Sequence, residues 1–142
     1  MKTEMNDWTE AVGAQPIATP PRYEEALIQM RNCGGVANYE LAIFNAFSLA
    51  PRHTLTASEL ARECGFTDKN EANLRFGQLA KRVSEALHFM PRSRHGDGEP
   101  RWWPTLAYAP NQEGDSEGHW QWTMRPELLE ALRAMRWVRV AH

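Results

Sequence analysis

Apolar residues recur at three- and four-residue steps between Lys69 and Leu87. At about 100° per residue, this spacing places them in one stripe along a helix. The stripe consists of Ala72, Phe76, Leu79, Ala80, Val83, Ala86 and Leu87. The opposite side is polar, apart from the lone aliphatic residue Leu74. We therefore predict an amphipathic helix over 69–87 whose apolar side faces a core.

A shorter helical pattern, Ala57–Cys64, precedes this helix and has clear boundaries. Thr56 is a favourable N-cap residue, and Glu59 follows three residues later, as a capping box requires. Gly65 lies where helices commonly end in the left-handed conformation. This order of a short helix, a turn and a longer helix is that of a helix-turn-helix, in which the second helix is the candidate recognition helix.

Two further helices are predicted closer to the N-terminus. Arg22–Arg31 is amphipathic and ends at a pair of glycines. Asn38–Ala50 is apolar on nearly all sides and ends before a proline, so we expect it to be buried on several sides as the central helix. The following residues, 52–55, are expected to form an extended linker or one short strand.

The periodicity changes after Phe89. Arg101–Pro110 and His119–Met124 are short, aromatic-rich runs with strand-like alternation. We predict that they form the two arms of an antiparallel hairpin, connected by the polar residues 111–118. Because Pro104 lacks an amide donor, the first arm should lie at a sheet edge or contain a bulge.

The second arm and the C-terminal region complete the expected core. Trp120 and Trp122 alternate onto one face of the arm, and we expect them to cover the sheet as core residues rather than to stack on bases. A last helix is predicted over Pro126–Trp137, because proline suits the first turn and an apolar stripe follows it.

These elements predict a mostly α fold with a small antiparallel β-hairpin: a winged type of helix-turn-helix with extra N- and C-terminal helices. The first segment, 1–21, has several prolines and no sustained helical or strand periodicity, and is expected to be a flexible tail. The remainder, 22–142, has the length of a single domain. We expect the two terminal helices to pack together or across the two-fold axis of a homodimer.

With these elements in order, the chain resembles the winged-helix group of helix-turn-helix proteins. The resemblance covers roughly Asn38–Met124 and rests on element order together with TASELARECGFTDKNEANLRFGQLAKRV. ANLRFGQLAKRVSEAL, a Trp-rich hairpin and WTMRPELLEAL are similar to small winged-helix modules of bacterial and phage proteins. The resemblance implies duplex DNA binding by a transcriptional regulator or DNA-targeting accessory protein, with the second helix of the motif in the major groove.

The charge distribution gives mixed support for DNA binding. The formal net charge is −2, whereas nucleic-acid-binding domains usually carry a basic excess. The region 69–95 is nevertheless locally positive. Candidate contacts to bases or phosphates are Lys69, Asn70, Asn73, Arg75, Gln78 and Lys81, and candidate contacts to the DNA backbone are Arg82, Arg92 and Arg94. The same cations would also suit a solvated helix face with local ion pairs.

The connection within the predicted hairpin is acidic and favours an alternative function. Glu113, Asp115 and Glu117 would repel phosphates, so we expect the tip of the hairpin to avoid DNA. Together with Leu74, these carboxylates would suit a protein-interaction module, such as a phage or bacterial inhibitor or adaptor with a basic target.

The sequence predicts no catalytic site, cofactor or metal. It has no nucleophile elbow, phosphate-binding loop or dinucleotide-binding motif, and its histidines have no metal-ligand spacing. An enzyme is therefore only a residual hypothesis. No apolar run is long enough to span a membrane, and the two cysteines lie in no pairing motif. We expect a cytoplasmic protein.

Overall fold

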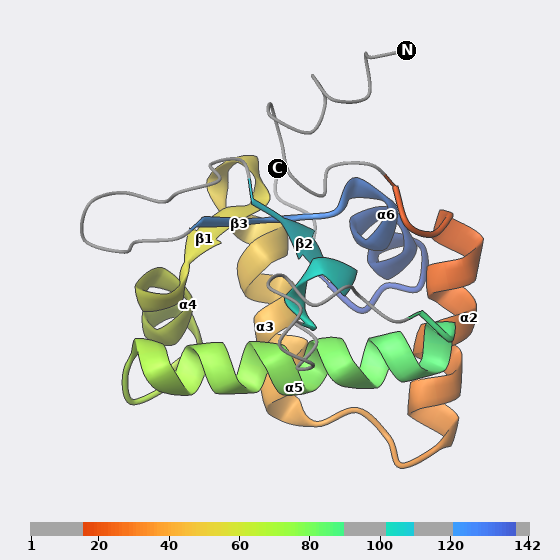
Figure 1. The fold of residues 1–142 in the computed structure, drawn as a ribbon, viewed down its shortest axis with the longest axis horizontal. Coiled ribbons are helices and arrows are strands. Elements are labelled where there is room, and N and C mark those ends of the chain that lie inside the picture. The colour runs from red at the N-terminus through yellow and green to blue at the C-terminus, as the bar shows by residue number, and fades with distance from the viewer. Residues whose placement is uncertain (1–15, 90–101, 110–120, 139–142) are drawn as a thin grey trace, which may run out of the picture.

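The computed structural model describes residues 16–89, 102–109 and 121–138. Figure 1 shows helices around a small sheet. In chain order, the elements are α2 (Pro20–Asn32), α3 (Asn38–Leu49), a 3₁₀ turn at Pro51–His53, β1 (Thr54–Thr56), α4 (Ala57–Cys64), α5 (Lys69–Leu87), a 3₁₀ turn at Trp103–Thr105, β2 (Ala107–Tyr108), β3 (Gln121–Met124) and α6 (Pro126–Ala134).

The predicted boundaries of α4 and α5 are confirmed, because local capping determines both. In the capping box of α4, the Thr56 hydroxyl accepts a hydrogen bond from the amide of Glu59 at 3.1 Å, and the Glu59 carboxylate accepts one from the amide of Thr56 at 2.8 Å. Gly65 ends the helix with a φ of 76°. Asp68 caps α5 by accepting from the amide of Glu71 at 3.0 Å.

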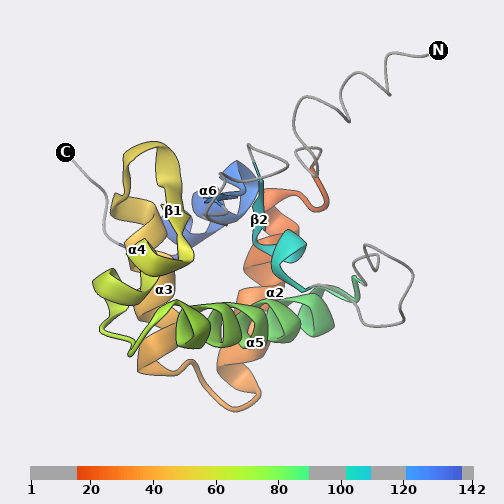
Figure 2. The same cartoon turned by 60° about the vertical axis from the view of Figure 1, so that its left-hand side comes forward.

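The helix α5 crosses the lower part of both views, between the sheet above it and the loop that connects α2 to α3 below it (Figures 1 and 2). Its apolar stripe packs against α2, α3 and α4. Phe76 is fully buried between aromatic rings, with centroids 5.3 Å from Phe47 and 4.3 Å from Trp122. The predicted core role of Trp122 is confirmed, whereas Trp120 lies outside the described residues.

The antiparallel pairing between the two predicted arms is confirmed, but the sheet is larger than a hairpin. Ala107 pairs with Met124 and Tyr108 with Thr123. The segment β1 is a third strand and pairs with the other side of β3, so the order is β1-β3-β2. This pairing attaches the start of α4 to the second arm of the hairpin.

The first arm is shorter than predicted. Only Ala107–Tyr108 forms a strand, and the residues before it make the 3₁₀ turn Trp103–Thr105. Pro104 favours that turn because its φ is fixed and it cannot donate to a ladder. The strand β2 does lie at an edge of the described sheet, as predicted.

The terminal helices pack against each other within one chain. Their buried residues are Tyr23, Ala26, Leu27 and Met30 on α2 and Leu128, Leu129, Ala131 and Leu132 on α6. Since both stripes are covered internally, neither supports the homodimer. The dimer stays a prediction that light scattering can test.

Two boundary expectations were wrong. The helix α2 begins at Pro20, because the Thr19 hydroxyl caps it by accepting from the Arg22 amide at 3.3 Å. The helix α6 ends at Ala134, and Trp137 packs against the core beyond it. The helix α3 was expected to be buried on several sides; its Ile43, Phe44 and Phe47 are buried, and Leu49 near its end is 49% exposed.

The described fold is therefore mostly helical with a small three-stranded antiparallel sheet, which confirms the coarser part of the fold-class prediction, mostly α with a small antiparallel β element. Within residues 16–89, 102–109 and 121–138, no helix is long and apolar enough to cross a membrane.

Candidate functional site

The side of α5 that faces away from the core forms a polar surface, which we call the outer face. Two rows with four-residue spacing make up most of it, because residues one turn apart lie side by side on a helix. The first row is Asn70, Leu74 and Gln78, and the second is Asn73, Gly77 and Lys81; Lys69 lies at the start of the helix. All of these residues except the half-buried Gly77 are exposed.

The chemistry of the outer face suits a polar, anionic ligand that carries hydrogen-bonding edges. The amides of Asn70, Asn73 and Gln78 each offer a donor and an acceptor, the pair that matches an adenine edge in the major groove. Lys69 and Lys81 make no ion pair with any described residue. The ammonium of Lys81 lies 5.9 Å from the centre of the Trp102 ring, and the Lys81 side chain is exposed at the surface.

Leu74 is the most exposed large apolar side chain among the described residues, at 57%. It lies in the middle of the first row, between two amides. An exposed aliphatic group in this position can contact a thymine methyl group or enter an apolar pocket of a protein partner. Leu74 therefore belongs to both functional hypotheses.

Arg75 is held on the flank of the outer face rather than pointing freely from it. Its Nε lies 3.5 Å from the Glu71 carboxylate, one turn earlier on α5. Its guanidinium also lies over the Tyr39 ring, 4.9 Å from the centroid. The Glu71 carboxylate accepts a hydrogen bond from the Thr67 amide, and this bond, with smaller help from Arg75, lowers the pKa of Glu71. Arg75 therefore fits the alternative interpretation of these cations, a solvated helix face with local ion pairs.

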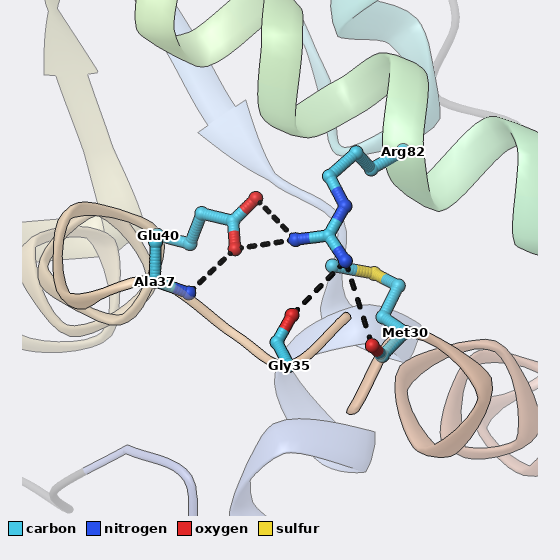
Figure 3. A network of polar contacts seen from close by, with 5 residues as sticks. All are labelled: Met30, Gly35, Ala37, Glu40 and Arg82. Carbon is cyan, nitrogen blue, oxygen red and sulfur yellow. Dashed lines mark hydrogen bonds and ion pairs between the residues drawn. The ribbon is translucent and has the colours of Figure 1, made fainter. Parts of the chain in front are cut away.

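Arg82 is part of a polar network between α5, α3 and the end of α2 (Figure 3). Its Nη1 donates to both carboxylate oxygens of Glu40, at 2.7 and 2.9 Å. Its Nη2 donates to the carbonyl oxygens of Gly35 at 3.0 Å and Met30 at 3.4 Å. The same carboxylate accepts from the Ala37 amide at 2.9 Å. Arg82 thus connects three segments of the fold, and we do not retain it as a DNA contact.

The local positive charge counted from the sequence is consequently smaller at the surface. Of the four cations on α5, Arg75 and Arg82 have carboxylate partners, which leaves Lys69 and Lys81. The sequence signal for Arg82 was ambiguous because its partner, Glu40, is 42 residues away. Glu40 is only 1% exposed, and a glutamate in a first helical turn gave no sign of such burial.

Sequence reasoning also missed a second buried polar cluster, which fixes the 3₁₀ turn before β2. The Tyr23 hydroxyl donates to the Thr105 carbonyl at 2.8 Å, and the side chains of Ser84 and Thr105 hydrogen-bond to each other. The Arg125 Nε donates to the Pro104 carbonyl at 2.8 Å. Burial raises the pKa of Tyr23 and lowers the pKa of Arg125. This cluster holds the hairpin against α2 and α5.

Several candidate residues cannot be placed. Arg92, Arg94, Glu113, Asp115 and Glu117 all lie outside the described ranges. The expected DNA contacts of Arg92 and Arg94, and the expected avoidance of DNA by the acidic residues, therefore stay predictions.

Other surfaces suggest less chemistry. A groove of about 460 Å³ between α3, β1 and α4 has a mainly apolar lining that includes Ala46, Leu49 and Leu55. In the described part of the chain, no three His, Cys, Asp or Glu side chains are placed to hold a metal ion. Cys33 is exposed, while burial, with a smaller contribution from Glu63, raises the pKa of the half-buried Cys64 thiol to about 11. None of these features competes with the outer face.

No family of proteins, curated protein or solved structure matches this chain in sequence or fold comparison. The interpretation of the outer face therefore rests on its own residues and their arrangement.

Proposed function

We propose that this chain is a winged-helix module that binds duplex DNA through α5, as a transcriptional regulator or a DNA-targeting accessory protein. The order α3, β1, α4, turn, α5 and hairpin supports this fold assignment. The pairing of β1 with β3 also supports it, since it holds the hairpin beside the helix-turn-helix.

The composition of the outer face carries the proposal. Three exposed amides and two lysines lie on one side of a 19-residue helix. A helix with side chains fits the major groove of B-DNA, where Asn and Gln pair bidentately with adenine. Lysines contact phosphates and supply affinity that depends on salt. The proposed division is base reading by Asn70, Asn73 and Gln78, and phosphate contact by Lys69 and Lys81.

Selection from a random duplex library, followed by binding titrations at two salt concentrations, tests the proposal. We expect a selected sequence to bind at least about 10³-fold more tightly than random duplex. Gln78→Ala should cost about 1–3 kcal/mol in binding and relax the preference at one position. Gln29→Ala, which changes an exposed glutamine on α2, is the matched control and should leave binding unchanged. Wild-type protein that selects no sequence would contradict sequence-specific DNA binding.

The exposure of Leu74 favours one other candidate function, a protein-interaction module. In that case Leu74 and the acidic residues Glu113, Asp115 and Glu117 would contact a basic partner. Duplex affinity would then stay at the non-specific level in the wild type and in every variant. A cross-linked partner that no longer binds Leu74→Asp, or the variant with the three acids neutralised, would support this alternative.

A further inference from the structure

The middle of α5 contains a glycine that the described fold does not require. Gly77 lies well inside this 19-residue helix, where glycine is the least favourable residue apart from proline. Its φ lies outside the left-handed range, so an alanine would adopt the same backbone conformation without strain. Backbone geometry therefore gives no reason for glycine at this position.

Packing within the described residues gives no reason either. A Cβ built on Gly77 meets no described atom within 4 Å. The helix α5 does pack against α2, α3, α4 and the 3₁₀ turn Trp103–Thr105. Its buried apolar residues and the contacts of Arg75 and Arg82 lie at other positions along the helix. Among the described residues, position 77 therefore has room for at least a methyl group.

The location of Gly77 indicates what it could accommodate. It lies between Asn73 and Lys81 in the second row of the outer face, next to Leu74 and Gln78 in the first row. Longer side chains surround it, so the helix carries no side chain at one point in the middle of the candidate binding surface. Glycine is typical of positions where a backbone comes close to a ligand.

We propose that Gly77 is the point at which α5 comes closest to bound DNA, with its backbone facing the base edges at the floor of the major groove. This inference rests on the proposed function. Contact at close range would bring the short side chain of Asn73 and the amide of Gln78 within hydrogen-bonding distance of the bases. A side chain at position 77 would hold the helix away from the groove and weaken these contacts together.

The test combines two variants of increasing size with two measurements. Gly77→Ala and Gly77→Leu both introduce good helix formers, so loss of helix stability cannot explain weaker binding. We expect Gly77→Ala to raise the melting temperature by about 2–4 °C. We also expect its affinity for the selected duplex to fall at least about tenfold, and that of Gly77→Leu to fall further. Gln29→Leu on α2 controls for an added apolar side chain.

The possible outcomes separate this inference from the function on which it rests. Selected binding by the wild type together with unchanged affinity of Gly77→Ala would overturn the inference and leave the function standing. A lower melting temperature of Gly77→Ala would also overturn it, because the fold itself would then need the glycine. Wild-type protein without any preferred duplex would overturn both.

Discussion

The outer face of α5 and the network around Arg82 place similar residues of one helix in opposite situations. Lys81 lies at the surface without an ion pair to a described residue, whereas its chain neighbour Arg82 bonds to a buried carboxylate and two carbonyl oxygens. The two positions are about 100° apart around the helix axis. Adjacent cations can therefore have unrelated roles: Arg82 holds the fold together, whereas Lys81 belongs to the proposed binding surface.

This comparison shows why a count of basic residues is a weak guide to a DNA-binding surface. The partners of Arg82 come from the end of α2, the loop that follows it and the first turn of α3, which lie beside α5 (Figure 3). Among the described residues, no carboxylate forms an ion pair with Lys69 or Lys81. A cation becomes available for phosphate only where the fold leaves it unpaired.

The largest expected effect comes from breaking the Arg82 network. Arg82→Gln leaves the Glu40 carboxylate, which is 1% exposed, without its cation. We expect a decrease of about 3 kcal/mol in the free energy of unfolding, measured in urea. Arg133→Gln, which changes an exposed arginine on α6, is the control.

A double variant distinguishes the stability lost by removing the whole ion pair from the stability lost by leaving the buried Glu40 carboxylate unpaired. Glu40→Gln with Arg82→Gln should recover part of the stability, because no unpaired carboxylate remains. Folded Arg82→Gln should keep the salt dependence of duplex binding. Unchanged stability with a flatter salt dependence would instead place Arg82 among the DNA contacts.

The second effect concerns the lysines of the outer face. Lys69→Ala with Lys81→Ala should leave the unfolding free energy within about 0.5 kcal/mol of wild type. Removing one phosphate interaction lowers the slope of log affinity against log salt by about 0.9, so the slope of the double variant should be smaller by about 1.8. Titrations between low and moderate salt measure this slope. An unaltered slope would remove both lysines from the interface.

A smaller effect is expected from Leu74→Ala. Because the side chain is 57% exposed, we expect a stability change within about 0.5 kcal/mol. If Leu74 contacts a thymine methyl group, replacing thymine by uracil in the selected site weakens wild-type binding but not that of the variant. Equal weakening for both proteins would show that Leu74 contacts no methyl group.

The smallest effect is a pH dependence at the start of α5. The pKa of Glu71 is lowered, so its contribution to stability is present above the ordinary pKa and disappears as the pH falls through the lowered value. Glu71→Gln should therefore melt at a lower temperature than wild type at pH 7, and the difference should shrink in acid. Glu130→Gln on the exposed side of α6 controls for the removal of one negative charge. A difference that is independent of pH would contradict this role.

Local sequence signals were enough to predict the helices α4 and α5. Thr56, Gly65 and the apolar stripe define α4 and α5 within a few residues of each boundary, so both ranges were found without tertiary information. Period-two alternation likewise indicated the pairing of β2 with β3. The third strand was left open, because three residues carry too little pattern to separate a strand from an extended linker.

The sequence by itself determined which side of α5 faces the core and which polar residues lie on the other side, since both follow from the helical period. Only the tertiary structure decided which of those residues are available for binding. The partners of Arg82 come from positions 30, 35 and 40, far from it in sequence. The open space around the Cα of Gly77 also depends on which elements pack beside α5. Ion pairing and open space arise from contacts between distant segments, and no local period encodes them.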